Sequence, residues 1–344
     1  MPAKPATAAP ERIGEREFIA LMAMMMALQA LGIDAMLPAL DRIARDLAVP
    51  DPNQRQLVVG VFLFAAGFGS LLPGVLADRY GRRPVLLTCF AGYIVLAIGC
   101  ALVTSFSMLL VLRALMAVAS AGLAVLPSAI IRDRFGGDRM ARTMSTIIVV
   151  FMFVPMIAPS FGQAVLLVAS WRWIFGGMAV MAFIVGTWMF LRLPETLNPE
   201  FRQPIAPGVI VRNMWDSARH RVAFGYALGS AMLTAAMFGY INSSQQLIAE
   251  HFGAGERFPL IFALLAGGMA VANFSNSRIV ERFGARRVSH TALLAYIAIS
   301  LIQVWRAFSG EETLWQFVPL MAANICLMGC IGANFGSLAL QPFA

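Results

Sequence analysis

Long apolar runs separated by short charged loops set the pattern of this chain. About ten runs have the roughly 20 residues that a helix needs to cross a hydrocarbon core about 30 Å thick. A single segment satisfies all of its own backbone polar groups in lipid only as a helix, and Gly and Pro recur inside these runs as they do in spanning helices. The pattern therefore predicts an all-α polytopic membrane bundle with spans at 18–39, 55–77, 84–104, 106–131, 143–169, 172–191, 222–248, 257–280, 287–307 and 314–340.

The amino-acid composition agrees with a membrane protein and excludes other classes of protein. The 344 residues are 59% hydrophobic and 13% charged, whereas soluble domains carry about 25% charged residues. The net charge of +8 comes from arginines in short loops, without the basic stripe and interleaved aromatics of a nucleic-acid-binding protein. The four cysteines lie in apolar runs and indicate core residues, not a disulfide framework. Residues 1–17 mix acids and bases without a cleavage site, which predicts a cytoplasmic tail.

The distribution of Lys and Arg predicts the orientation. If the N-terminus is inside, 19 basic residues fall in inner segments and 6 in outer loops, the remaining one being Arg113 within a span. The Pro-rich and charged stretch 192–221 is the one long connection, so we expect a six-helix half at 18–191, a central cytoplasmic linker at 192–221 and a second half at 222–344.

An internal repeat supports two halves. The loop DRYGRR at 78–83 returns as ERFGAR at 281–286, 203 residues later. Parallel repeats of six spans are common in secondary transporters. The counterpart of the fifth span would begin near residue 346, which predicts that the last two of twelve spans are absent from this chain of 344 residues. Those spans, supplied in trans, are an expected partner.

The stretch GVLADRYGRRPVLL at 74–87 resembles the signature loop between spans 2 and 3 of the major facilitator superfamily. Glycine permits the tight turn, the acid can cap or pair, and arginines hold the loop at anionic lipid. We expect an inner gate at this loop and a second one at its repeat. The residues concerned are Gly74, Asp78, Arg79, Gly81, Arg82 and Arg83, and then Glu281, Arg282, Gly284 and Arg286.

Further stretches are similar to the bicyclomycin-resistance (Bcr/CflA) group of drug:proton antiporters: IDAMLPAL at 33–40, VLRALMAVASAG at 111–122, PMIAPSFGQ at 155–163, WRWIF at 171–175 and YINSS at 240–244. The resemblance implies multidrug efflux coupled to protons in the bacterial inner membrane, and antibiotic resistance. In the fifth span, Pro155, Pro159, Gly162 and Gln163 favour a kinked helix that packs closely.

Two charges lie well inside spans, where each costs about 2.5–3.5 kcal/mol on the insertion scale. They are Asp34 in the first span and Arg113 in the fourth, at similar depth. An arginine favours the charged carboxylate and burial favours the neutral acid, so a motion that separates the pair could move a proton. In the alternative, Asp34 caps the outer end of its span and Arg113 snorkels to the headgroups.

The second half offers neutral polar groups in place of charges. Amides beside Met and Phe suit amphipathic ligands of variable shape, and the residues expected to line a substrate cavity are Tyr240, Asn242, Gln245 and Asn334. Alternatively, these groups bond between helices. The chain has no glycine-rich loop ending in Lys-Ser or Lys-Thr and no clustered histidines, so we expect no ATP coupling and no metal.

The leading function is export of small amphipathic compounds in exchange for protons, with the proton gradient as energy source and no other cofactor. Uptake or facilitated diffusion of a metabolite is a second possibility. A fragment that does not transport is a third. An enzyme is not expected, because the sequence has no nucleophile–base or metal constellation. The sequence names no substrate.

Overall fold

The structure is a computed structural model, and it describes residues 13–202, 208, 212, 215, 219–310 and 313–340. These residues are mostly helical and include no strand, as the length of the apolar runs predicted. The expected linker at 192–221 and the tail at 1–17 lie in part outside the described residues. The long helices are α1 (Glu15–Asp34), α3 (Leu57–Gly69), α4 (Leu71–Tyr80), α5 (Arg82–Leu102), α6 (Phe106–Arg134), α7 (Gly137–Val168), α8 (Arg172–Arg192), α10 (Arg221–Gln245), α11 (Phe258–Phe283), α12 (Ala285–Ser309) and α13 (Leu314–Leu340).

Short helical turns join several of these helices. They are η1 (Leu37–Ala39), α2 (Leu40–Asp46), η2 (Pro52–Gln56), η3 (Pro199–Phe201), the π-helix η4 (Gln246–His251) and η5 (Gly255–Arg257). By length and composition, nine helices of the described chain can cross a membrane, and the α3–α4 pair makes a tenth if it is one span. The chain is thus a multi-pass membrane protein.

The second predicted span, 55–77, is not one straight helix. It breaks at Ser70 into α3 and α4, which meet at an angle of 41°. Two local causes lie at the break. The Ser70 hydroxyl donates to the carbonyl of Gly67 at 2.7 Å, and Pro73 has no N–H to donate to the carbonyl of Gly69.

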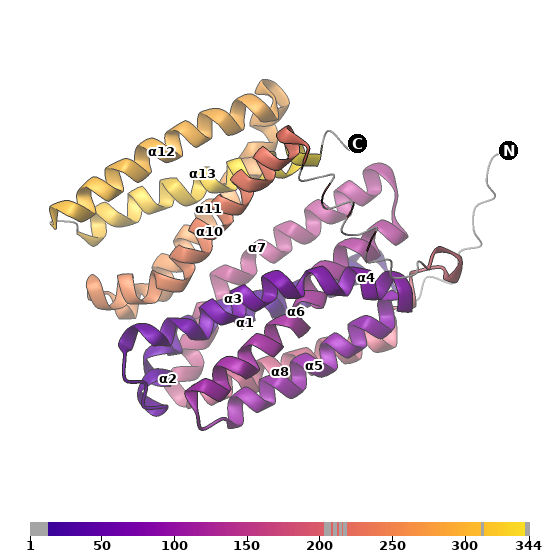
Figure 1. The fold of residues 1–344 in the computed structure, drawn as a ribbon, viewed down its shortest axis with the longest axis horizontal. Coiled ribbons are helices and arrows are strands. Elements are labelled where there is room, and N and C mark those ends of the chain that lie inside the picture. Colours follow the sequence, from indigo (N-terminus) through magenta and orange to yellow (C-terminus); the bar gives the residue numbers. More distant parts are fainter. Residues whose placement is uncertain are drawn as a thin grey trace. The chain divides into compact units, whose positions relative to one another are not determined.

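The described residues group by contact into two compact units that are not continuous in sequence. Of the described residues, the first takes 13–33, 61–151 and 169–202, and the second takes 34–60, 152–168 and those from 208 to 340. In the first unit α5 packs against both α6 and α8, and in the second α13 packs against α10, α11 and α12 (Figure 1). The division into sequential halves stays a prediction.

Each unit has buried apolar side chains in its interior. In the first, large apolar side chains such as Trp171, Phe175 and Phe62 are fully buried. In the second, α13 supplies Met328, Ile331 and Phe335 to a buried apolar cluster with Leu233 and Ala292. Many large apolar side chains face outward instead, among them Phe308, Trp315 and Trp305, which is the pattern of a helix bundle solvated by lipid.

Candidate functional site

Asp34 is the last residue of α1, after a run of apolar residues. The residue is 3% exposed, and its Oδ1 is buried without a hydrogen-bond partner in the structure. Buried polar atoms are rarely left unmatched, because each costs about 1–3 kcal/mol in lost hydration. An unmatched carboxyl oxygen in an apolar helix therefore marks Asp34 as a functional candidate.

Arg113 of α6 is fully buried in the first unit. Its Nη1 donates to the carbonyl of Gly32 at 2.8 Å, and its guanidinium lies 4.2 Å from the centroid of Phe62 and 5.9 Å from that of Phe175. Stacking on aromatic faces and a carbonyl acceptor are what a desolvated guanidinium requires. The Arg113 side chain thus lies within the helix packing of its unit.

The carbonyl that Arg113 contacts belongs to Gly32, two residues before Asp34 in the same helix. Asp34, however, begins the second contact unit and Arg113 belongs to the first. Their partnership in proton coupling therefore stays a prediction.

The predicted inner gate loop forms a tight corner between α4 and α5. Gly81 has a φ of 104°, which other residues rarely adopt, and a Cβ on it would lie 2.5 Å from Oε2 of Glu195. The Glu195 carboxylate accepts hydrogen bonds from the backbone N–H groups of Arg82 at 2.9 Å and Arg83 at 3.1 Å. A carboxylate from the segment after α8 thus caps the N-terminus of α5.

Arg82 ties the same corner to two acids. Its Nη1 lies 2.7 Å from Asp78, and its Nε donates to Asp133 at 2.9 Å, while its side chain is only 4% exposed. Arg83 donates to the carbonyl of Phe190 at 2.6 Å. Asp133, Glu195 and Phe190 were not among the residues predicted from the sequence.

One signal could have revealed Glu195. The first turn of α5 holds no acid of its own, so its N–H groups need a carboxylate from elsewhere, and Glu195 is the first acid after the predicted sixth span. Of the other predicted gate residues, Arg79 stacks 5.5 Å from the ring of Tyr80, and Gly74 has open space where a side chain would start.

The repeat of this loop at 281–286 has a glycine with positive φ at the corresponding position. Gly284 has a φ of 81°, ends α11 and begins α12, 203 residues after Gly81. Among the residues that the structure describes, no acid approaches it as Glu195 approaches Gly81, since a Cβ on Gly284 would meet nothing within 4 Å. The remaining predicted residues of this second loop are Glu281, Arg282 and Arg286, of which Arg282 stacks 5.3 Å from the ring of Phe283.

The predicted fifth span is α7, a continuous helix that contains Pro155 and Pro159. Gly162 touches the backbone of the segment after α1, because a Cβ there would lie 2.1 Å from the carbonyl oxygen of Ala35. Near the C-terminus of α7, Arg42 donates to the carbonyl of Leu166 at 2.7 Å. The end of α7 is therefore held tightly against residues 35–42.

The predicted cavity residues separate into two groups. Asn334 of α13 exchanges two hydrogen bonds with Asn276 of α11, at 3.1 and 3.3 Å, which is the interhelical role left open by the sequence. Tyr240, Asn242 and Gln245 of α10 each have a buried polar side-chain atom without a partner in the structure. Those three remain candidates for contact with a ligand.

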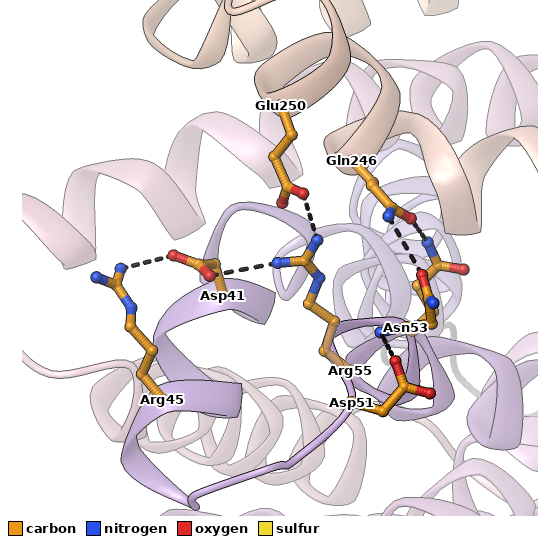
Figure 2. Close-up of polar contacts among 8 residues, drawn as sticks. Asp41, Arg45, Asp51, Asn53, Arg55, Gln246 and Glu250 are labelled. Atoms are coloured by element: carbon orange, nitrogen blue, oxygen red, sulfur yellow. Dashed lines mark hydrogen bonds and ion pairs between the residues drawn. The ribbon is translucent and has the colours of Figure 1, made fainter.

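A polar network that the sequence analysis missed lies within the second unit (Figure 2). Arg55, whose side chain is 5% exposed, lies 3.3 Å from Asp41 and 2.5 Å from Glu250. Beside it, Gln56 donates to Gln246. The network joins η2 to α2 and to the π-helix η4, at the end of the bundle that the Lys and Arg distribution assigns to the outside.

Gln163 and Gln245, two residues selected from the sequence, line one cavity of about 170 Å³ in this unit, together with Asp41 of the network. They belong to α7 and α10, which are far apart in the sequence. The structure thus brings together one residue of the predicted fifth-span motif and one of the predicted substrate cavity.

Comparison with known proteins places the chain in a family. The model of the Major Facilitator Superfamily matches residues 19–343. An uncharacterized MFS-type transporter of Bacillus subtilis, YdgK, is 33% identical over 282 residues, which are 81% of this chain and 68% of the relative. A bicyclomycin resistance protein homolog of Haemophilus influenzae is 29% identical over 80% of this chain and 69% of its own.

The fold is similar to solved transporters. A bacterial homolog of the human lysosomal transporter Spinster, in an inward-facing and occupied conformation, has a TM-score of 0.71 and 18% identity. The match covers 95% of this chain and 74% of that one. The chain belongs to the Major Facilitator Superfamily.

Proposed function

We propose that this chain is a secondary active transporter of the bacterial inner membrane that exports small amphipathic compounds in exchange for protons. The proton gradient is the energy source in this proposal, without a further cofactor, and the N-terminus is cytoplasmic. The observation that carries the proposal is the buried carboxyl group of Asp34, whose Oδ1 has no hydrogen-bond partner in the structure.

The physical argument rests on the change of surroundings during a transport cycle. Apolar surroundings disfavour the charged form of a carboxyl group, and water favours it. An acid that meets water in one conformation and apolar side chains in another therefore takes up and releases a proton once in each cycle. Carboxylates within membrane spans are common parts of proton relays for this reason.

Similarity to relatives named for drug resistance supports small amphipathic compounds as the proposed substrates. One relative is named a bicyclomycin resistance protein homolog, and another, a protein of Klebsiella pneumoniae that is 26% identical over 321 residues, is named a multidrug resistance protein, MdtL. The amides of Asn242 and Gln245 and the hydroxyl of Tyr240 on α10 each have a buried polar atom without a partner in the structure, which suits ligands that are partly polar.

The test is proton release driven by substrate. The full chain is reconstituted in vesicles, a pH-sensitive dye reports protons, and bicyclomycin is added. We expect release by the parent protein, loss in Asp34→Asn and partial retention in Asp34→Glu. Asp46→Asn, which changes an exposed acid of α2, is the matched control and should behave as the parent.

Other outcomes point to other functions. Full proton release by Asp34→Asn would refute the role of this carboxyl group. Bicyclomycin movement down its gradient that does not depend on pH would indicate facilitated diffusion, and the absence of flux in a correctly inserted chain would indicate a protein that does not transport by itself.

A further inference from the structure

The cavity that contains Gln163 and Gln245 has a charged wall. Its lining comes from four segments of the second unit, namely η1 and α2, the end of α7, the junction of α10 with η4, and η5 with the start of α11. The ten lining residues are Pro38, Asp41, Arg42, Arg45, Gln163, Leu166, Gln245, Ala249, Gly255 and Phe258. Two arginines and one aspartate are the charged members.

The charge of Asp41 is already matched. Its Oδ2 lies 2.6 Å from Arg45 and its Oδ1 lies 3.3 Å from Arg55, which stands beside the lining (Figure 2). Arg55 also binds Glu250. The cavity wall and its neighbours therefore contain two acids, Asp41 and Glu250, and three arginines, Arg42, Arg45 and Arg55. The wall of the cavity therefore carries more positive than negative charge.

Both lining arginines keep donors for a ligand. A guanidinium group has five N–H donors. The Arg42 side chain donates to the carbonyl of Leu166, and the Arg45 side chain donates to Asp41. These are the side-chain hydrogen bonds of the two arginines within the described residues. Since a guanidinium can bind a carboxylate through two parallel hydrogen bonds, such spare donors suit a planar anion.

A buried and unmatched amide completes the wall. Gln245 is 8% exposed, and its Oε1 has no hydrogen-bond partner in the structure. The chain changes from α-helix to π-helix directly after it, at Gln246, and such π-helical turns are frequent at functional sites. An amide can offer either its oxygen or its NH₂ group to a ligand, because the two ends differ only by a flip of the side chain.

We propose that this cavity is a binding site for a small organic compound that carries a carboxylate, and that it is separate from the proton site at Asp34. The guanidinium groups of Arg42 and Arg45 bind the carboxylate, and the amides of Gln163 and Gln245 bind its polar substituents. The site goes beyond the proposed export of amphipathic compounds, because it assigns a second ligand class to the end of the bundle that is predicted to lie outside.

The experiment measures binding of benzoate and of benzamide, which have nearly the same shape but differ in charge. The purified full chain is placed in nanodiscs of phosphatidylcholine, so that no anionic lipid competes, and binding is followed by isothermal titration calorimetry. Benzoate should bind at least about ten-fold more tightly than benzamide, because the charged hydrogen bonds exist only for the anion.

Two variants test the wall without removing packed side chains. Arg45→Gln changes a side chain that is 71% exposed, and Gln163→Glu keeps the shape of the residue while adding a negative charge. Each should weaken benzoate about ten-fold or more and leave benzamide nearly unchanged. Arg278→Gln, an exposed arginine of α11, is the matched control.

Asp34→Asn separates this proposal from the proposed export function, since it should abolish proton release and leave benzoate binding as it was. Equal affinity for benzoate and benzamide would overturn the proposal. So would unchanged benzoate binding in both wall variants, or loss of benzoate binding in Asp34→Asn.

Discussion

The carbonyl oxygen of Ala35 occupies the space in which a side chain of Gly162 would begin, 2.1 Å from the position of a Cβ. The contact is with backbone, which cannot move aside as a flexible side chain can. A glycine is therefore required where α7 packs on the segment after α1. In membranes such close approach of backbones is a main source of helix association, because lipid provides no hydrophobic drive between helices.

Gly162→Ala should destabilise the protein by about 3 kcal/mol or more, at the upper end of what overpacking costs. The midpoint of thermal unfolding in detergent measures the effect. Gly239→Ala in α10 is the control, because a Cβ there meets nothing within 4 Å and alanine favours a helix by up to about 1 kcal/mol. Equal unfolding midpoints for the two variants would contradict the packing argument.

Glu195→Gln should slow transport more than it weakens ligand binding. The change removes the negative charge at the N-terminus of α5. It also leaves one acceptor oxygen where the carboxylate offers two, so one of the N–H groups of Arg82 and Arg83 loses its acceptor and the loop loosens. Flux and ligand binding are measured on one preparation, with Glu200→Gln of η3 as control. Affinity that falls in parallel with flux would argue against a gating role for this loop.

The same comparison applies to Asp78→Asn, which removes one of the two acids that hold Arg82. We expect a smaller loss of flux than for Glu195→Gln, because the bond from Arg82 to Asp133 remains and Asp78 is 47% exposed at its side chain. A larger loss would mean that Asp78 has a further partner in another conformation.

The variants Arg113→Lys and Arg113→Gln distinguish a role for the charge of Arg113 from a role for the shape of its side chain. Lysine keeps the positive charge but loses the flat stacking on Phe62, whereas glutamine loses the charge and can still donate to the carbonyl of Gly32. If charge serves proton coupling, proton release driven by substrate should persist in part in the lysine variant and vanish in the glutamine variant. Identical behaviour of the two would assign Arg113 to packing.

Asn334→Leu should destabilise the protein by about 1 kcal/mol, because it leaves the amide of Asn276 buried without its partner. The double change Asn276→Leu with Asn334→Leu should recover part of that loss, since no polar group is then unmatched. Unfolding midpoints of the single and double variants decide this. Unchanged stability in Asn334→Leu, with altered substrate preference, would instead favour the cavity role expected from the sequence.

Local sequence was enough to predict the spans and the tight corners. Runs of about 20 apolar residues have few alternatives to a spanning helix. The loops at Gly81 and Gly284 follow from glycine, which alone adopts their backbone angles without strain. The break of the second span at Ser70 was missed, although its causes, a serine followed by Pro73, are local too.

Contacts between distant segments were decided by the tertiary structure. Glu195 reaches Arg82 across 113 residues, and Arg55 reaches Glu250 across 195. Nothing in the spacing of a polar residue tells which distant helix end it will face, because that depends on how the helices cross. The sequence by itself thus determined the helices, their glycine corners and the rare charges within spans. Only the packing of the helices decided that Gln163 and Gln245 share one cavity and that Arg113 lies buried against Gly32, because side-chain partners are chosen by geometry in three dimensions.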